Sequence, residues 1–216
     1  MSVYGLTQGS LPVVFRLKGI RLEVEGRENV PREGAFVLVA NHRSNLDALL
    51  AQVACPRPVW SMAKSSQFRN PVMRWLLIHL NAFPTRRYQV DPQAVRSALR
   101  VVAKGRGLGL YPEGERSWNG EMQPLRRGAV RLLLKVGVPL VPCGISGSYE
   151  IQPRWSRTVG RGTARVRFGE PFELGRHDDR VARERLDRAY QRRLSLDTVS
   201  TDTGERLALP VWGWRL

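Results

Sequence analysis

Cysteine and histidine are scarce in this chain of 216 residues. The two cysteines, Cys55 and Cys143, lie far apart in apolar surroundings, and only three histidines (His42, His79 and His177) could accompany them. This set makes neither a zinc-binding spacing nor a disulfide framework. We therefore expect no metal site, and we expect a reducing compartment such as the cytoplasm.

Long apolar runs are missing as well. No run approaches the ~20 residues that a helix needs to cross a bilayer. The first 19 residues lack the basic start, long apolar stretch and small-residue cleavage site of a secretory signal. Any membrane contact is therefore expected to be peripheral.

Negative charge is also in short supply, because 19 acidic residues face 35 basic ones, a formal net charge of +16. Such a charge calls for an anionic partner: nucleic acid, an acidic lipid surface or a phosphorylated substrate. Charge alone does not choose among them, and codon bias in a GC-rich genome would produce the same excess of arginine. With 42% hydrophobic residues the chain can fill a core, so we treat residues 1–216 as one globular domain.

The apolar pattern predicts an α/β fold. Ile20, Leu22 and Val24 alternate with charged residues, as in a strand with one wet face, whereas the run from Ala35 to Ala40 suits a strand buried on both faces. The expected strands are 20–25, 35–40, 59–63, 108–111, 139–145 and 164–168, and the expected helices are 46–54, 71–80, 94–104, 129–136 and about 179–193. Because strands and helices alternate, we expect a mixed, mainly parallel sheet covered by helices.

Residues 41–47 read Asn-His-Arg-Ser-Asn-Leu-Asp, between a buried strand and an apolar helix. On one helix, residues five apart point ~140° away from each other, so His42 and Asp47 meet only if His42 lies in the loop and Asp47 in the first turn. Asp47 would then fix the imidazole tautomer while the other ring nitrogen removes a proton from a hydroxyl. The alternative is a capping box from Ser44 to Asp47, which would give Asp47 a purely structural role.

A protein nucleophile is not evident. Residues 144–148 (Gly-Ile-Ser-Gly-Ser) lack the last glycine of the G-x-S-x-G elbow, and Cys143 is expected to be an inert core thiol. A histidine base without such a nucleophile favours direct attack by the substrate's own hydroxyl, as in acyl transfer without a covalent intermediate.

Arginines follow two other expected strand ends. Arg86 and Arg87 end the segment 84–87, and Arg116 lies in the segment 112–117, which also carries Glu113 and Gly114. In open α/β sheets ligands gather at the carboxyl ends of strands, and guanidinium forks hold phosphates there. Each arginine pair alone would more often be a solvated surface in so basic a chain.

In the order and spacing of these motifs, residues 19–148 resemble the glycerophospholipid acyltransferases, the family of lysophosphatidic acid acyltransferase. Residues 41–47 match the family's H-x-x-x-x-D block, which implies that His42 is the general base and that Asp47 supports it. Residues 81–87 align with the second block and place Arg87 on its phosphate-binding arginine. Asn81 replaces the usual glycine there, and Arg86 could share the role.

The third and fourth blocks of this family complete the match. Tyr111–Ser117 resembles the third block, which implies that Glu113, Gly114 and Arg116 bind the glycerol phosphate. Glu115 stands where the family has threonine, and an extra carboxylate beside an anionic headgroup is unfavourable. Residues 139–142 look like the fourth block, which implies an acyl-chain contact for Pro142. After Tyr149 the resemblance fades, so the basic part 149–216 is not covered by it.

The resemblance implies transfer of a fatty acyl group from acyl-CoA or acyl carrier protein to the sn-2 hydroxyl of 1-acyl-sn-glycerol 3-phosphate, giving phosphatidic acid in phospholipid biosynthesis. It implies no metal, no bound cofactor and no nucleic acid. The alternatives are another acceptor (glycerol 3-phosphate, another lysophospholipid or a lyso-aminolipid) and, from a different class, a non-catalytic basic module that binds membranes or nucleic acid.

A lipid product and the +16 charge together predict peripheral binding to the anionic, cytoplasmic face of a membrane, at ~1 kcal/mol per basic residue near the surface. Candidate anchors are the segment 75–78, which begins at Trp75, and the pair Trp212 and Trp214. Ordinary packing would account for either group. The apolar stripe of the helix 179–193 is expected to pack onto the domain.

Overall fold

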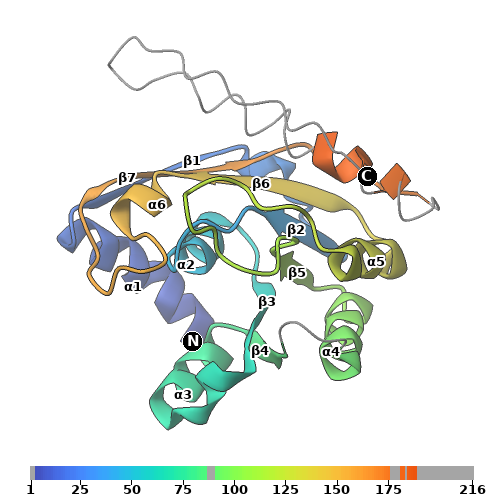
Figure 1. Cartoon of the computed structure of the whole chain (residues 1–216), viewed down its shortest axis with the longest axis horizontal. Coiled ribbons are helices and arrows are strands. Elements are labelled where there is room, and N and C mark those ends of the chain that lie inside the picture. Colours follow the sequence, from blue (N-terminus) through green and yellow to red (C-terminus); the bar gives the residue numbers. More distant parts are fainter. Residues whose placement is uncertain (1–2, 87–90, 176–180, 183, 189–216) are drawn as a thin grey trace.

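The computed structural model describes residues 3–86, 91–175, 181–182 and 184–188. Within them, seven strands form one sheet in the order β1-β7-β6-β2-β5-β3-β4 (Figure 1). The strands are β1 (Ile20–Glu25), β2 (Phe36–Ala40), β3 (Val59–Lys64), β4 (Ala82–Thr85), β5 (Gly107–Leu110), β6 (Leu140–Ser146) and β7 (Gly162–Phe168). All neighbours are parallel except β6 and β7, so the predicted mixed, mainly parallel sheet is confirmed.

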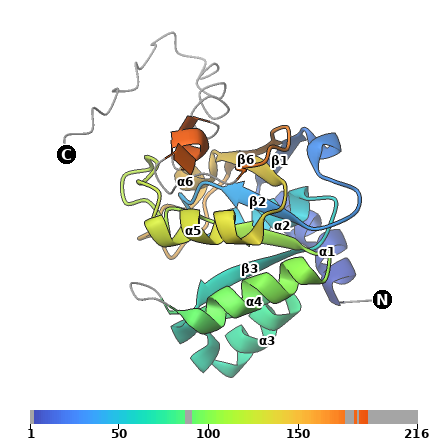
Figure 2. The ribbon, with the colours of Figure 1, turned by 90° about the vertical axis from the view of Figure 1, so that its right-hand side faces the viewer.

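Helices cover both faces of this sheet. They are α1 (Val3–Leu17), α2 (Asp47–Ala54), α3 (Pro71–His79), α4 (Pro92–Ala103), α5 (Arg127–Val136) and α6 (Ser148–Ile151). Two views at right angles show α4 and α5 side by side on one face, with α1 and α2 on the other (Figures 1 and 2). Each face of the sheet has its own hydrophobic core, and successive residues of β2 point into one core or the other. Phe36 and Leu38 belong to the core under α1 and α2, and Val37 belongs to the core under α4 and α5. A strand buried on both faces explains the unbroken apolar run in the sequence.

The shared direction of β2 to β6 positions the site. Each of these five strands is parallel to the strand beside it in the set, so all five carboxyl ends lie at one edge of the sheet. That edge receives the loop 41–46 after β2, the loop 111–126 after β5, Arg86 after β4, and the turn from β6 into α6. Four segments far apart in the sequence therefore lie along one edge, three of which the sequence pattern places there.

Three elements were not predicted from the sequence. Helix α1 contains Pro12 and carries exposed apolar side chains, while its Phe15 is buried in the core and its Leu11 packs against that core. Strand β4 is a short edge strand that contains Pro84, and an edge tolerates proline because one side of the strand has no ladder to join. Helix α6 is a single turn. The predicted strands and the first four predicted helices are all present, with ends shifted by no more than two residues.

The predicted helix near the C-terminus is described only in part. Residues 181–182 and 184–188 are helical, and Ala182 and Leu186 are buried in the core under α5, which confirms the predicted packing for these two. Ala189, Tyr190, Trp212 and Trp214 lie outside the described residues. Among the described residues, no helix combines the length and the apolar character that a bilayer span requires.

Candidate active site

His42 and Asp47 form a direct pair. Helix α2 begins at Asp47 while His42 lies in the preceding loop, the arrangement that the spacing of these residues requires. The Nδ1 atom of His42 lies 3.0 Å from Oδ2 of Asp47. Asp47 is fully buried, and the His42 side chain is 12% exposed. With Nδ1–H donating to the carboxylate, Nε2 carries the lone pair and can accept a proton.

Asp47 also holds the loop that carries His42. Its Oδ2 accepts hydrogen bonds from the backbone N–H groups of Arg43 (2.6 Å) and Ser44 (2.7 Å). The bond from Ser44 N is one half of the alternative capping box. The other half, a bond from Asp47 N to the Ser44 hydroxyl, is not formed in this described loop: the hydroxyl instead donates to the Gln152 carbonyl and accepts from Leu46 N. Asp47 therefore combines a structural role with contact to the imidazole.

Strand β6 and the turn after it support this pair from the other side. The Ser148 hydroxyl donates to Oδ1 of Asp47 at 2.6 Å. Asn41 exchanges two hydrogen bonds with the backbone of Ile145, which ties the end of β2 to β6. Gly147 has a φ of 74° there, and a Cβ atom would lie 2.0 Å from the Thr163 carbonyl oxygen. The segment 144–148 thus supplies a hydroxyl that positions Asp47. The one signal for Ser148 in the sequence was its place in that near-match to the nucleophile elbow.

Glu113 anchors the second loop to the first. It is 1% exposed, and its two carboxylate oxygens accept from His42 N (2.8 Å) and Gln123 N (2.9 Å). Burial raises the pKa of Glu113 to about 7, although the two backbone hydrogen bonds act in the opposite direction. Ser117 N donates to the His42 carbonyl at 2.8 Å, so the loop after β5 holds the His42 backbone at both its N–H and its C=O. In this arrangement Glu113 positions the histidine, and its predicted contact with substrate stays a prediction.

Glu115, which departs from the family pattern, is neutralised by two arginines that the motif analysis did not single out. Its oxygens lie 3.0 Å from Nη2 of Arg126 and 3.2 Å from Nη1 of Arg154. Arg154 also donates to the Arg116 carbonyl at 2.7 Å. The extra carboxylate therefore does not face a substrate anion without compensation, which removes the electrostatic objection raised by the sequence.

Gly114 and Arg116 lie in the same loop as Glu113, at the edge where His42 lies. Gly114 has a φ of 74°, and a Cβ atom there would lie 2.4 Å from the Arg126 side chain, so the turn requires glycine. Tyr111, at the start of the loop, stacks on His42 with ring centroids 4.3 Å apart.

Arg86, a predicted phosphate-binding residue, lies farther from His42. Arg86 is exposed after β4, three strand spacings from β2, or ~14 Å at ~4.8 Å per strand. Its backbone N–H donates to Asp91, and this bond lowers the pKa of that carboxyl. Arg87 lies outside the described residues. Pro142 is buried in β6 opposite Val39. Cys143 is a buried free thiol whose pKa is raised by burial, as expected of a core cysteine.

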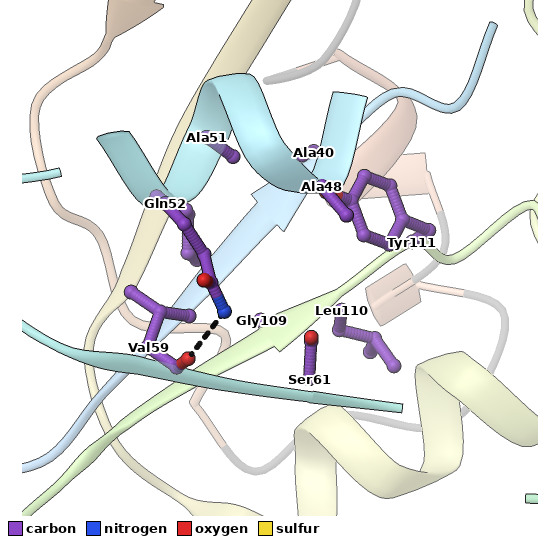
Figure 3. Close-up of a pocket in the computed structure, with 10 residues that line it drawn as sticks. Ala40, Ala48, Ala51, Gln52, Val59, Ser61, Gly109, Leu110 and Tyr111 are labelled. Atoms are coloured by element: carbon purple, nitrogen blue, oxygen red, sulfur yellow. Dashed lines mark hydrogen bonds between the residues drawn. The ribbon is translucent and has the colours of Figure 1, made fainter. Parts of the chain in front are cut away.

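A narrow apolar crevice, with a cavity volume of about 10 Å³ and so with room for about one water molecule, lies between α2 and the strands β2, β3 and β5 (Figure 3). Gln52 and Val59 lie at one end, joined by a hydrogen bond of 3.2 Å, and Tyr111 lies at the other (Figure 3). Because Tyr111 also stacks on His42, the crevice begins beside the pair formed by His42 and Asp47. Its lining contains Leu38, Ala40, Ala48, Ala51, Gln52, Val59, Ser61, Gly109, Leu110 and Tyr111, and Pro142 is not among these residues.

Comparisons with known proteins agree with this geometry. The 1-acyl-sn-glycerol-3-phosphate acyltransferase of Bacillus subtilis is 27% identical over 185 residues, which cover 85% of this chain and 89% of that protein. The alpha form from Homo sapiens is 31% identical over 160 residues, covering 72% of this chain and 56% of that protein. The relative from Borreliella burgdorferi is 29% identical, and again the chain spans only 56% of its length.

The fold has a counterpart among solved structures. The crystal structure of the 1-acyl-sn-glycerophosphate (LPA) acyltransferase from Thermotoga maritima superposes with a TM-score of 0.78 at 23% identity, covering 91% of this chain and 81% of that one. The family profile named Acyltransferase matches residues 21–146, more than half of the 216 residues and all four motif segments. The chain therefore belongs to the acyltransferase family.

Proposed function

We propose that this protein transfers a fatty acyl group from a thioester donor, acyl-CoA or acyl carrier protein, to the sn-2 hydroxyl of 1-acyl-sn-glycerol 3-phosphate. The product is phosphatidic acid, an intermediate of phospholipid biosynthesis. The observation that carries the proposal is the pair formed by His42 and Asp47 at 3.0 Å, at the carboxyl end of a central parallel strand. The names of the relatives in Bacillus subtilis and Homo sapiens support this acceptor.

The proposed reaction needs no covalent enzyme intermediate. Nε2 of His42 takes the proton of the acceptor hydroxyl as its oxygen attacks the thioester carbonyl. Asp47 stabilises the imidazolium that forms. When the tetrahedral intermediate collapses, the new C–O bond remains, the C–S bond breaks, and the proton on His42 passes to the departing thiolate. The enzyme returns to its starting state without any metal or cofactor.

The proposed site also needs groups that bind the acceptor phosphate and a surface for the acyl chain. Arg116, with Arg86 and Arg87, is proposed to bind the acceptor phosphate, since guanidinium forks match phosphate oxygens. Gly114 and Glu113 shape the loop that presents Arg116. The apolar crevice beside Tyr111 would have to widen to take an acyl chain, because it now has room for about one water molecule. A contact of Pro142 with the acyl chain would have to be made from within β6.

We also propose that the protein works at the anionic, cytoplasmic face of a membrane, bound peripherally. The surface that supports this is α3, none of whose residues is buried. Val72, Trp75 and Ile78 are 74%, 57% and 51% exposed. The surrounding segment 48–90 contains six basic residues and no acidic one. An exposed apolar helix in a positive segment is typical of interfacial membrane helices.

The test is acyl transfer by the purified protein from acyl-CoA or acyl carrier protein to 1-acyl-sn-glycerol 3-phosphate in vesicles, with His42→Ala alongside. We expect phosphatidic acid from the wild type and a rate near background from the folded variant. Parallel reactions offer glycerol 3-phosphate, another lysophospholipid and a lyso-aminolipid. Product from one of these alone would reassign the acceptor, and undiminished activity of His42→Ala would refute the mechanism. A protein that binds vesicles or nucleic acid but acylates nothing would be a binding module.

A further inference from the structure

Three aromatic side chains outside the family motifs gather next to the catalytic loop. We call them, with the arginines Arg43 and Arg154, the Trp118–Trp155 cluster; the third aromatic residue is Tyr149. Trp118 and Trp155 are each 59% exposed. The rings of Tyr149 and Trp155 meet edge to face at 5.6 Å, and the Tyr149 hydroxyl donates to the Trp118 carbonyl at 3.0 Å. Two loops about 30 residues apart in sequence therefore build one aromatic surface.

Guanidinium groups stack on these rings. The Arg154 guanidinium lies 3.8 Å from the centroid of the Trp118 ring, and its contacts with Glu115 and the Arg116 carbonyl hold it in place. One face of Trp118 is thus covered by a fixed cation, while more than half of the residue remains exposed to solvent. Such an arrangement leaves an indole surface on which a second flat ring can stack.

Arg43 adds an unsatisfied donor. Its guanidinium lies 5.9 Å from the centroid of the Tyr149 ring, and its nearest carboxylate, Glu150, is 3.8 Å away. Its Nε atom is buried and has no hydrogen-bond partner among the described residues. The rest of the guanidinium is partly open to solvent, since the Arg43 side chain is 25% exposed. An anionic group placed there would pair with the Nη groups of Arg43.

Three residues of the cluster directly follow, in the sequence, a residue of the His42–Asp47 site. Trp118 follows Ser117, whose N–H donates to the His42 carbonyl, and Tyr149 follows Ser148, which donates to Asp47. Arg43 follows His42 itself. The cluster therefore lies beside His42 on the β6 side, whereas Arg86 lies on the β4 side. The acceptor phosphate is assigned to Arg116, Arg86 and Arg87, so Arg43 and the exposed indoles remain for the second substrate.

We propose that the Trp118–Trp155 cluster binds the adenine nucleotide of acyl-CoA. This inference rests on the proposed acyl transfer and specifies its donor. Nucleic-acid bases stack on exposed aromatic side chains whatever their sequence, and guanidinium forks bind phosphates. The flat adenine ring can stack on the exposed indoles, and the phosphate oxygens of the nucleotide can accept hydrogen bonds from the Arg43 guanidinium. An acidic carrier protein would pair with the arginines alone and has no base to stack on two tryptophans.

Direct binding tests the nucleotide without any acyl chemistry. Adenosine 3′,5′-bisphosphate is titrated calorimetrically into the full chain and into Trp118→Leu, Trp155→Leu and Trp155→Phe. We expect the dissociation constant to rise about tenfold in each leucine variant, the scale of one lost base stack, and Trp155→Phe to restore most of the affinity. Leu17→Ala is the control, since Leu17 is 82% exposed but lies on α1, and it should bind like the wild type. Absence of binding by the wild type, or equal affinity in all variants, would overturn the proposal.

Kinetics then distinguish the two donors. With palmitoyl-CoA, we expect KM to rise about tenfold in Trp155→Leu while kcat stays within twofold. With palmitoyl-acyl carrier protein, KM should be unchanged. An equal rise with both donors, or a rise with the carrier protein alone, would contradict nucleotide binding. If no acceptor is acylated, the proposed function fails while the calorimetric result still stands on its own; if acylation proceeds and the nucleotide does not bind, only the cluster proposal fails.

Discussion

At the scale of single residues, the site converges on Asp47. This buried carboxylate accepts hydrogen bonds from the loop backbone at Arg43 and Ser44, from Ser148, and from the imidazole of His42. Buried charges are stable only when they are paired and hydrogen-bonded, and this set satisfies both oxygens. The same bonds fix the orientation of His42, so the loop geometry and the proposed proton transfer depend on one group.

Ser148 offers the first prediction, because it positions Asp47 without touching the reacting atoms. Ser148→Ala removes the donor at 2.6 Å from Oδ1, so Asp47 keeps its contact with His42 but gains freedom to rotate. We expect kcat to fall about tenfold with KM nearly unchanged, and the free energy of unfolding to fall by ~1–2 kcal/mol. Steady-state kinetics and denaturant unfolding measure both. Ser148→Thr, which restores a hydroxyl, should recover part of kcat.

A matched control for this variant is Ser146→Ala, two residues earlier in β6. It removes a hydroxyl that does not contact Asp47, and we expect wild-type kinetics. If Ser146→Ala and Ser148→Ala lost the same activity, the effect would come from disturbance of β6 rather than from positioning of Asp47.

Glu113 leads to a pH-dependent prediction. Its pKa is raised by burial from 4.5 to about 7, so between these pH values the folded protein binds more protons than the unfolded chain. Stability therefore falls as the pH rises from about 4.5 to about 7 and is flat above that range, a loss of ~3 kcal/mol at most. Urea unfolding at pH 5, 6 and 7 should show this decline in the wild type relative to Glu113→Gln. A parallel pH dependence in the two proteins would exclude Glu113 as its source.

At the scale of elements, the local apolar pattern predicted the strands whose position depends on how many of their faces are buried. The period-two alternation of β1 and the unbroken apolar run of β2 reflect one-sided and two-sided burial, and both strands appear where the patterns place them. Strand β4 could not be predicted in this way, since four residues with a proline carry no periodicity and the strand depends on pairing with β3. Helix α1, with Gly5, Gly9 and Pro12 in its sequence, contradicts propensity and is supported by the burial of Phe15.

Helix α3 is the element for which we predict membrane contact. Replacing Trp75 or Ile78 with glutamate removes an exposed apolar side chain and adds negative charge, so binding to anionic vesicles should weaken at least tenfold for each substitution. The melting temperature should barely change, because neither side chain is buried. Vesicle flotation measures the binding. Val159→Glu is the control, an apolar side chain that is 40% exposed but lies outside α3, and its unchanged binding would locate the effect on α3.

At the scale of the whole molecule, sequence distance decided how much of the site could be predicted. His42 and Asp47 lie five positions apart, so spacing and helix geometry alone indicated their contact. Ser148 lies 101 positions from Asp47, and Arg154 lies 39 positions from Glu115. These contacts exist because the parallel strands bring their carboxyl ends to one edge and because β6 is adjacent to β2. Strand order is set by packing of the entire sheet, and no local pattern encodes it.

The charge of the whole chain gives the last prediction. The net charge is +16, and Lys64, Arg69 and Arg74 lie in or beside α3. Basic residues near an anionic leaflet contribute ~1 kcal/mol each, so reversing these three charges to glutamate should weaken vesicle binding by about 10²-fold or more. Because the screening length falls from ~10 Å at 0.1 M salt to ~3 Å at 1 M, salt should weaken the wild type strongly and the reversed variant little. If flotation were independent of salt, apolar contacts of α3 alone would hold the protein on the membrane, and the positive charge would have to serve the anionic substrates instead.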